Sequence, residues 1–228
     1  MLIRVPSVLN SDKLGECRGL LSNGPWVNGS ASAGSLAVHV KNNEEIDQRD
    51  PVAQRLGQIV VDAMMATALF QAAALPVRIS PPSFSRYAPG QAYGFHNDAA
   101  ILEFSVSGAR LLVRTDLAAT LFLNAPEDYD GGELVVEDNF GLTKVKLAAG
   151  DMVLYPASSL HRVQPVTRGT RLVSFFWIQS MVRDDHHRRM LYDLDMTIQQ
   201  LRRSAPDNEA GLKLVNLYHN LLRLWSET

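Results

Sequence analysis

The chain has 228 residues, of which 46% are hydrophobic and 20% are charged, and its formal net charge is −2. These values are those of an ordinary globular protein that can bury a sizeable core. No run of basic residues exceeds a few positions, so we expect neither a nucleic acid nor a membrane surface as partner.

Cysteine usage and hydropathy indicate the compartment. Cys17 is the only cysteine, which excludes an intrachain disulfide and a thiolate metal cluster within one chain. The N-terminus lacks the long apolar segment of a signal peptide, and the longest apolar stretch, near residues 59–75, is interrupted by polar side chains. We therefore expect a soluble protein of the reducing cytoplasm.

The first forty residues predict a short strand and one helix. Asn10 or Ser11 caps this helix, and its apolar residues recur at helical spacing until the turn at residues 23–25. Residues 26–40 are rich in Gly, Ser and Ala, and they suit a flexible loop or short strands.

The segment VKNNEEID, residues 40–47, is a polar patch. Two interpretations stay open for it, a solvated turn or one wall of a pocket. In the second interpretation, Lys41, Asn42 and Asn43 form hydrogen bonds to a polar substrate.

A second, longer helix is predicted after this segment. Asp50 caps it, Pro51 takes its first position, and apolar residues mark one face for several turns. The helix must end near Leu75, because Pro76 disfavours helical backbone in the residue before it. We expect this long helix to lie along a sheet as its buttress.

From residue 77 to residue 181 the pattern changes to short apolar runs separated by turn residues. Such runs, with no helix between them, are typical of a β-sandwich or jelly roll with about eight strands in two sheets. Asp130, Gly131 and Gly132 give a strong signal for a hairpin turn. The runs are VRIS, FSRY, ILEFSV, DLAATLFLN, GELVVED, LTKVKL, DMVLY, HRVQPV and RLVSFFWIQSM.

The stretch FSRYAPGQAYGFHND, residues 84–98, places His96 and Asp98 two residues apart. On an extended chain, residues i and i+2 point to the same face, so the imidazole and the carboxylate converge. Such a pair is two thirds of the 2-His-1-carboxylate triad that binds Fe(II) and leaves positions open for other ligands. The third ligand must be a distant histidine.

His161 is the best candidate for that third ligand. It opens a short apolar run in a region that reads as consecutive antiparallel strands. His186 and His187 lie in a mixed-charge stretch typical of a solvated helix face, and His39 and His219 have no acidic partner at a ligand spacing.

Arg171 follows His161 by ten residues, so in a hairpin its side chain faces the same cavity. A planar guanidinium matches a carboxylate with two charge-assisted hydrogen bonds. This arginine is therefore predicted to hold the far carboxylate of a small diacid.

The end of the chain predicts two helices, which form a helical segment at residues 182–228. Asp184 and Asp185 begin the first one and Arg202 and Arg203 end it, as the helix dipole favours. Asp207 is predicted to cap the second. The sequence leaves open whether these helices pack on their own chain or on a neighbouring subunit of a homo-oligomer.

The chain resembles the Fe(II)/2-oxoglutarate-dependent dioxygenases of the prolyl 4-hydroxylase superfamily. The resemblance rests on His96, Asp98, His161 and Arg171 and on the segments around them, RYAPGQAYGFHND, YDGGELVV and GDMVLYPASSLHRVQPVTRGTR. Three further segments resemble a narrower group, the bacterial PKHD-type hydroxylases, which are linked to iron uptake. These segments are the opening VPSVL, the segment VKNNEEID and the ending from WIQSMVRDD to NLYHNLLRLWSE. The likeness runs nearly end to end.

This resemblance implies a mainly β fold, a double-stranded β-helix or jelly roll buttressed by helices. The dioxygenase domain would span residues 1–181, with its β core at about 77–181, and residues 182–228 would be a helical appendage. In this family pattern His96, Asp98 and His161 bind Fe(II), and Arg171 pairs with the C5 carboxylate of 2-oxoglutarate.

The resemblance also implies a reaction and further site residues. The hydroxyl of Tyr87 assists the C5 carboxylate, unless this tyrosine is a core aromatic. The co-substrate is decarboxylated to succinate, an unactivated C–H bond is hydroxylated with dioxygen, and ascorbate serves as reductant. Two substrate classes stay open, a protein side chain and a small metabolite such as a siderophore, and an apolar groove rimmed by Asn42, Asn43 and Arg114 would suit either.

A different class of protein stays open as an alternative. A cupin-like metal-binding protein or isomerase uses the same barrel and a similar His-x-Asp pair without 2-oxoglutarate. Arg171 argues against it, because a simple metal-binding cupin has no reason to place a guanidinium there. A non-catalytic interaction protein is disfavoured because all four site residues are present.

Overall fold

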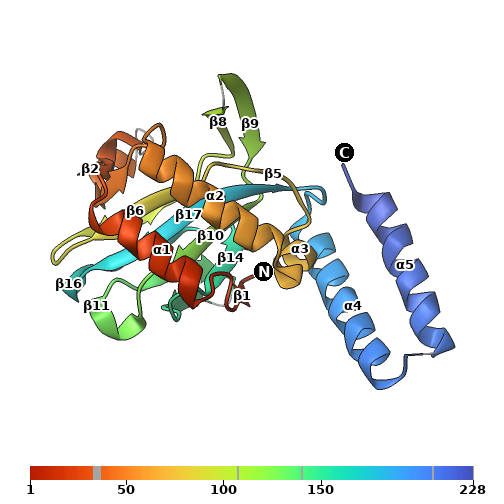
Figure 1. Cartoon of the computed structure of the whole chain (residues 1–228). Helices are drawn as coiled ribbons and strands as arrows, with labels where there is room; N and C mark the ends of the chain where they lie inside the picture. Colours follow the sequence, from red (N-terminus) through yellow and green to blue (C-terminus); the bar gives the residue numbers. More distant parts are fainter. Residues whose placement is uncertain (33–36, 107, 140, 207, 228) are drawn as a thin grey trace.

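Two antiparallel sheets that face each other form a jelly roll, with helices on one outer face and at one end (Figure 1). The computed structural model describes residues 1–32, 37–106, 108–139, 141–206 and 208–227. The mainly β architecture with flanking helices is therefore confirmed.

The larger sheet carries the strand that begins with Arg171. In its described part it has eight strands, seven of them in the order β1-β14-β10-β17-β6-β4-β2, and β5 pairs with the far end of β17. The bounds are β1 (Ile3–Val5), β14 (Met152–Pro156), β10 (Leu117–Phe122), β17 (Arg171–Ser180), β6 (Ser83–Tyr87), β4 (Glu44–Ile46), β2 (Trp26–Asn28) and β5 (Pro76–Ile79).

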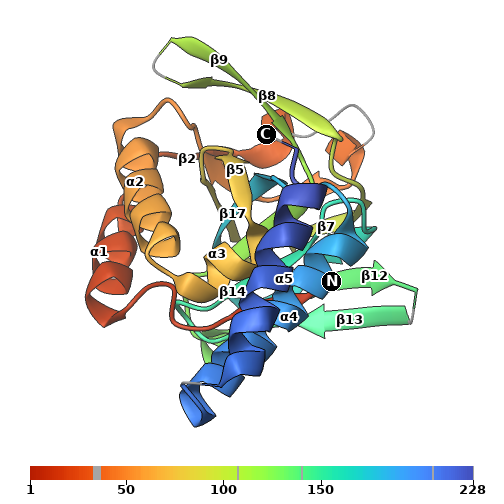
Figure 2. The same cartoon turned by 90° about the vertical axis from the view of Figure 1, so that its right-hand side faces the viewer.

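The smaller sheet carries both histidines of the predicted triad. Its order is β13-β12-β15-β7-β3, with β13 (Gly141–Val145), β12 (Leu134–Asp138), β15 (His161–Val163), β7 (Ala92–His96) and β3 (Lys41–Asn42). Two separate ribbons complete the β structure: β8 (Ile101–Val106) with β9 (Ala109–Arg114), and β11 (Tyr129–Gly131) with β16 (Val166–Gly169). Figure 2 shows the β8–β9 ribbon projecting from the top of the barrel.

Alternating side chains of the larger sheet supply two cores. On β17, Val173 points between the sheets, where it joins Leu134 and Val136 of the smaller sheet. Phe176 and Ile178 point the other way, into the layer between the sheet and the helices. Side chains point to alternate faces because a strand has a period of two residues. The inner faces of both sheets therefore surround the predicted site.

The N-terminal helices cover the outer face of the larger sheet. The first, α1 (Ser11–Ser22), is capped as predicted: the side chain of Asn10 accepts a hydrogen bond from the backbone N–H of Lys13 at 3.0 Å. The second, α2 (Pro51–Met65), begins at the predicted cap, because Asp50 accepts from the N–H of Val52 at 2.8 Å. Short 3-10 turns lie at η1 (Gly29–Ser32), η2 (Ala37–His39) and η3 (Pro126–Asp128).

The prediction of one long helix up to Leu75 is wrong. The chain bends by 86° after α2, and a separate helix α3 (Ala68–Ala74) follows. Thr67 leaves the helical region (φ −93°, ψ 106°), and the turn lets Phe70 and Ala73 pack into the core. In the described residues no single helix is long and apolar enough to cross a membrane; α2 and α3 meet that criterion only together, across this bend.

Most of the predicted strands are present, but the predicted hairpin at Asp130-Gly131-Gly132 is wrong. The strands on its two sides do not pair with each other: β11 pairs with β16, whereas β12 pairs with β13 and β15. The two glycines have positive φ angles of +71° and +67° and carry the chain from one ribbon to the other sheet. Strands β7 and β9 were not among the predicted runs.

The C-terminal helices pack on their own chain. The helix α4 (Asp185–Ser204) is capped by Asp184, and α5 (Glu209–Trp225) is capped by Asn208, while the predicted cap Asp207 lies outside the described residues. Leu191 of α4 is fully buried against Leu75 and Val182, next to residues of α5. The sequence left open whether these helices pack on their own chain or on another subunit, and this contact is made within one chain.

Replacing Leu191 by alanine is expected to lower the free energy of unfolding by about 2–5 kcal/mol, because this leucine is 0% exposed. The matched control is Leu212→Ala on α5, a leucine that is 71% exposed, for which a change within about 0.5 kcal/mol is expected. Chemical denaturation of both variants measures this. Equal stability of the two variants would contradict the packing of α4 on the barrel.

Candidate active site

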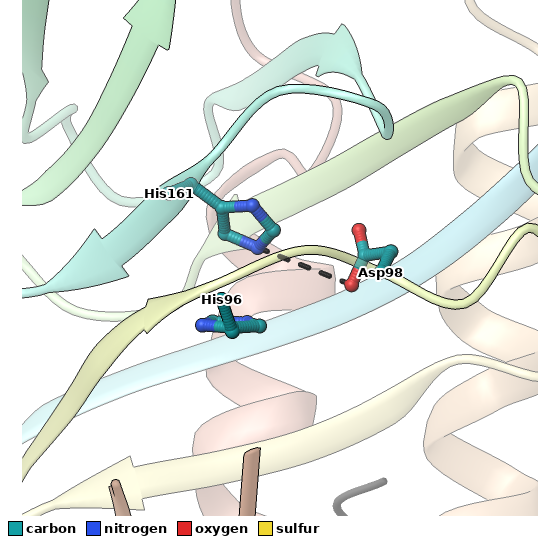
Figure 3. A group of neighbouring side chains, drawn as sticks. All are labelled: His96, Asp98 and His161. Carbon is teal, nitrogen blue, oxygen red and sulfur yellow. Dashed lines mark ion pairs between the residues drawn. The ribbon is translucent and has the colours of Figure 1, made fainter. Parts of the chain in front are cut away.

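The three predicted metal ligands lie together. His96 ends β7 and His161 begins β15, and these two residues stand directly opposite each other in the smaller sheet. Asp98 lies two residues beyond β7, and its Oδ1 is 4.0 Å from Nε2 of His161 (Figure 3). One ligand atom from each residue lies within 4.8 Å of the others. Ligands at about 2.0–2.2 Å from one ion lie at most about 4.4 Å apart, so binding an ion would draw these side chains slightly closer together.

Backbone carbonyls fix both imidazoles in the orientation that a metal requires. Nδ1 of His96 lies 2.8 Å from the carbonyl oxygen of Gly94, and Nδ1 of His161 lies 3.0 Å from that of Ser159. A carbonyl only accepts, so Nδ1 carries the proton and Nε2 keeps its lone pair. Such hydrogen bonds set the tautomer of metal-binding histidines.

The electrostatics of the three ligands also suit a cation. Burial, reinforced by the neighbouring His161, lowers the pKa of His96 to about 4, so this imidazole is neutral at pH 7. Burial raises the pKa of Asp98, against the opposing influence of His161 and Trp177. Oδ2 of Asp98 is buried without a hydrogen-bond partner among the described residues. Since an unsatisfied buried carboxylate oxygen is costly, a bound metal ion fits this site.

The histidine pair at the start of α4 has another role. His187 stacks on Trp225 of α5, with ring centroids 4.2 Å apart and planes 3° from parallel. Among the described residues, His96, Asp98 and His161 form the one group of three ligand side chains at metal-binding spacing.

Arg171 begins β17 and stands opposite Tyr87 of β6 in the larger sheet. It is only 1% exposed, and its guanidinium carbon lies 5.2 Å from the ring centroid of Tyr87 and 5.6 Å from that of Phe122. In the described part of the chain no carboxylate pairs with it, and its buried Nε has no hydrogen-bond partner. A buried unpaired charge is expensive, so this arrangement indicates that an anionic ligand completes it.

Gly132 makes room for this arginine. A Cβ on Gly132 would lie 3.1 Å from Cδ of Arg171 and 3.0 Å from Cε2 of Tyr129, and the backbone there has a φ of +67°. Both the conformation and the contact therefore favour glycine at this position.

Replacing Gly132 by alanine is expected to weaken the binding of a dicarboxylate ligand, such as the predicted 2-oxoglutarate, about tenfold, because the new methyl group would displace Arg171 and impair one charge-assisted hydrogen bond. The matched control is Gly108→Ala, at a similar φ of +79° with nothing within 4 Å of the added Cβ. Both variants should lose about 1–2 kcal/mol of stability from the left-handed backbone. Titration calorimetry that showed equal affinity in both variants would refute the space-making role.

Tyr87 lies where the sequence predicts it, beside Arg171. It is buried, and burial raises the pKa of its hydroxyl to about 12, so the group is neutral. Arg171, Ser85 and Asn43 all lie near this hydroxyl, and the ring of Tyr87 packs on the guanidinium. Tyr87 is therefore buried in the core beside Arg171, and the assistance of its hydroxyl to a bound carboxylate stays a prediction.

The segment of Lys41, Asn42 and Asn43 joins the two sheets and is not a solvated turn. Lys41 and Asn43 point inward and are buried, while Asn42 between them is exposed. Nζ of Lys41 forms an ion pair of 2.6 Å with Glu45, and it lies 5.3 Å from the ring of Tyr93. That ring stacks on His96 at 3.6 Å. The structure thus brings Lys41 and Asn43 to the interior, but not Asn42.

Arg114 is not brought to the triad. Its guanidinium donates to the carboxylate of Asp116 at 2.8 and 3.0 Å, to Glu227 at 3.0 Å and to the carbonyl of Ser180 at 3.2 Å. These partners tie the end of α5 to the barrel. These contacts give Arg114 a structural role, and its predicted contact with the substrate stays a prediction.

Several aromatic groups around the site were missed in the sequence. Trp177 follows Arg171 by six residues on one strand, so the period of two along β17 places both on the inner face. The rings of Tyr155 and His161 meet edge-on, with their centroids 5.2 Å apart. Burial raises the pKa of the Tyr155 hydroxyl, Asp98 raises it further and Arg171 lowers it, so both charged groups lie near this hydroxyl. The triad and the arginine therefore border the same interior.

Comparison with known proteins agrees with this geometry. Residues 82–179 match the 2OG-Fe(II) oxygenase superfamily, and residues 185–227 match the PKHD-type hydroxylase C-terminal domain. A PKHD-type hydroxylase of Klebsiella pneumoniae subsp. pneumoniae is 52% identical over 226 residues, which are 99% of this chain and 100% of the relative.

Two solved structures share the fold. A prolyl-4-hydroxylase of Pseudomonas putida is 20% identical, with a TM-score of 0.52 over 78% of this chain and 92% of that one. HygX of Streptomyces hygroscopicus, solved with nickel, 2-oxoglutarate and hygromycin B bound, is 17% identical, with a TM-score of 0.51 over 77% of this chain and 81% of that one.

Proposed function

The chain belongs to the PKHD-type hydroxylases of the 2OG-Fe(II) oxygenase superfamily, and from this premise we propose that His96, Asp98 and His161 hold its iron. Membership makes the protein an Fe(II)- and 2-oxoglutarate-dependent dioxygenase that hydroxylates its substrate and releases succinate and carbon dioxide. We assign the far carboxylate of 2-oxoglutarate to Arg171.

The buried guanidinium of Arg171 supports this assignment most strongly. Within the described residues it has no carboxylate partner, although it is 1% exposed, and a dicarboxylate co-substrate would supply one. A cupin that binds only a metal leaves such an arginine unexplained. The same interior holds the three ligand atoms of the triad.

Each residue then has a defined task. His96 and His161 would each offer Nε2 to the ion and Asp98 a carboxylate oxygen, and such a set of three protein ligands suits an Fe(II) ion that also binds a co-substrate. When bound, iron, 2-oxoglutarate and dioxygen supply the oxidising chemistry, in which the co-substrate becomes succinate and carbon dioxide and a C–H bond becomes C–OH. Arg171 fixes the far carboxylate, and the rings of Tyr87, Tyr93 and Trp177 keep water away from the interior.

We further propose how the substrate is recognised. Oδ1 of Asn43 is buried without a partner among the described residues, and the neighbouring Ser85 hydroxyl is in the same state. Both groups lie near Tyr87, on the inner wall formed by Lys41, Asn43 and Glu45. This wall would bind a polar group of a protein side chain or of a small metabolite such as a siderophore.

Compartment, reductant and assembly follow the same premise. We propose a cytoplasmic enzyme, because a single cysteine and an Fe(II) site suit a reducing compartment, and we propose ascorbate as its reductant. Residues 182–228 would act as an appendage to the domain at 1–181. A second copy would bind through exposed apolar side chains on one face of α5, namely Leu217 and Leu224.

Substrate-stimulated turnover tests the substrate class. The protein is loaded with Fe(II) under anaerobic conditions, and succinate formation from 2-oxoglutarate is measured with a peptide library and with a siderophore library. A substrate is expected to raise succinate formation above the uncoupled rate and to gain one oxygen atom by mass spectrometry. Stimulation without any oxygenated product would contradict hydroxylation of that compound.

A further inference from the structure

Tyr129 is a buried tyrosine beside Arg171 with an unsatisfied hydroxyl. The residue is 0% exposed, and its hydroxyl oxygen has no hydrogen-bond partner among the described residues. A buried hydroxyl usually has a partner, because leaving it unpaired costs about 1–3 kcal/mol. The sequence did not single out this residue.

The position of the Tyr129 ring is fixed by its neighbours. The ring packs with Tyr87, Val163 and Val166 in one small apolar cluster. Nζ of Lys146 lies 4.0 Å from the ring centroid and donates to the carbonyl oxygen of Tyr129 at 2.6 Å. The ring therefore needs no rearrangement to present its hydroxyl to a ligand.

Gly132 shows that Tyr129 and Arg171 meet at one place. A Cβ there would lie 3.0 Å from Cε2 of Tyr129, the carbon next to the one that carries the hydroxyl, and 3.1 Å from Cδ of Arg171. Nε of Arg171, the next atom along that side chain, also lacks a partner in the described part of the chain. Two unsatisfied polar groups thus lie side by side.

The neighbouring Tyr87 differs in this respect. Arg171 lies near both hydroxyls, but the hydroxyl of Tyr87 also has the polar side chains of Ser85 and Asn43 beside it, whereas Arg171 is the hydrogen-bonding side chain beside the hydroxyl of Tyr129. Burial raises the pKa of the Tyr129 hydroxyl, so the group keeps its proton at neutral pH and donates a hydrogen bond. A carboxylate bound to Arg171 is the acceptor that this donor lacks.

We propose that Tyr129 is a third residue of the co-substrate site, and that its hydroxyl donates a hydrogen bond to the 2-oxoglutarate carboxylate held by Arg171. This inference rests on the proposed function of Arg171. It makes Tyr129 a specificity-determining residue, because its hydroxyl discriminates 2-oxo acids with a distal carboxylate from those without one.

The test is equilibrium binding without turnover. Ni(II)-loaded protein is titrated by calorimetry with 2-oxoglutarate and with 2-oxopentanoate, which has the same chain length but no distal carboxylate. In Tyr129→Phe the affinity for 2-oxoglutarate should fall about tenfold, as expected for one hydrogen bond to a charged group. The affinity for 2-oxopentanoate should stay unchanged.

Tyr87→Phe is the matched comparison, since it removes a hydroxyl from the other tyrosine beside Arg171. Its loss of 2-oxoglutarate affinity should be clearly smaller than that of Tyr129→Phe. Thermal unfolding of the ligand-free variants adds an independent readout. Tyr129→Phe should match or exceed the wild type, because the removed hydroxyl is unsatisfied, whereas a structural hydroxyl would lower the melting temperature.

Three results would overturn the inference: equal losses for both 2-oxo acids in Tyr129→Phe, no loss for 2-oxoglutarate, or a larger loss in Tyr87→Phe. Failure of the underlying function looks different. In that case the wild-type protein itself would bind 2-oxoglutarate no better than 2-oxopentanoate.

Discussion

Replacing His161 by alanine is expected to abolish stoichiometric Fe(II) binding while the chain stays folded. His161 supplies one of three ligand atoms that lie within 4.8 Å of one another. Loss of a residue that merely orients a ligand costs about 10–100-fold in metal affinity, so loss of a ligand itself should cost at least as much. The measurement is total metal content after anaerobic loading and desalting, with circular dichroism as the test of folding.

The matched control for this prediction is His187→Ala. That histidine stacks on Trp225 and lies outside the triad, so its loss should leave the metal content unchanged. Nickel, cobalt or zinc found in the purified protein counts as metal bound at the triad, because sites with nitrogen and oxygen ligands generally bind these divalent ions more tightly than Fe(II). Equal metal content in His161→Ala and the wild type would refute the assignment.

Substituting lysine for Arg171 is expected to raise the Michaelis constant for 2-oxoglutarate by about ten- to a hundredfold. Lysine keeps the charge but gives up the two-pronged guanidinium, and a lost hydrogen bond to a charged group is worth about 1.5–3 kcal/mol. Metal affinity should be nearly unchanged, because Arg171 is not a ligand. Succinate formation across a titration of 2-oxoglutarate gives the constant.

An exposed arginine on the adjacent ribbon provides the control for this second prediction. Arg168 pairs with Asp130 at 2.7 Å on the surface, and Arg168→Lys should leave the Michaelis constant as it is. If Arg171→Lys and Arg168→Lys gave the same constant as the wild type, Arg171 would not be the carboxylate anchor.

The positions of the triad and of Arg171 were predictable because their signals in the sequence are local. His96 and Asp98 are two residues apart on extended backbone, and His161 and Arg171 are ten residues apart in a region of short strands. The strand register brings together residues whose sequence spacing alone does not show that they meet. It pairs His96 with His161 in the smaller sheet and Tyr87 with Arg171 in the larger one.

Features that depend on distant contacts were not predictable. The break at Thr67 lies inside a run of good helix formers, and it is decided by how Phe70 packs into the core. Two consecutive glycines at residues 131 and 132 suggest a tight turn, but the strands on either side of them pair with other strands, β11 with β16 and β12 with β13. Arg114 finds Glu227 across 113 positions of sequence, beyond any local pattern.

The polar strand at residues 41–45 shows how an ambiguous pattern is resolved. Its five residues are all polar, so the sequence alone does not show which face is buried. The structure buries Lys41, Asn43 and Glu45 and exposes Asn42, because the segment connects β3 of one sheet to β4 of the other. A charged face thus lies inside the barrel, where the ion pair between Lys41 and Glu45 offsets part of the cost of burying these charges.

A crystal structure of the protein with Ni(II) and 2-oxoglutarate, recorded at the nickel absorption edge, tests the central claim most directly. We expect one anomalous peak at about 2.0–2.2 Å from Nε2 of His96, from Nε2 of His161 and from a carboxylate oxygen of Asp98. The far carboxylate of 2-oxoglutarate should lie on the guanidinium of Arg171. A peak elsewhere, or a co-substrate carboxylate held by Lys41 and not by Arg171, would contradict the proposed site.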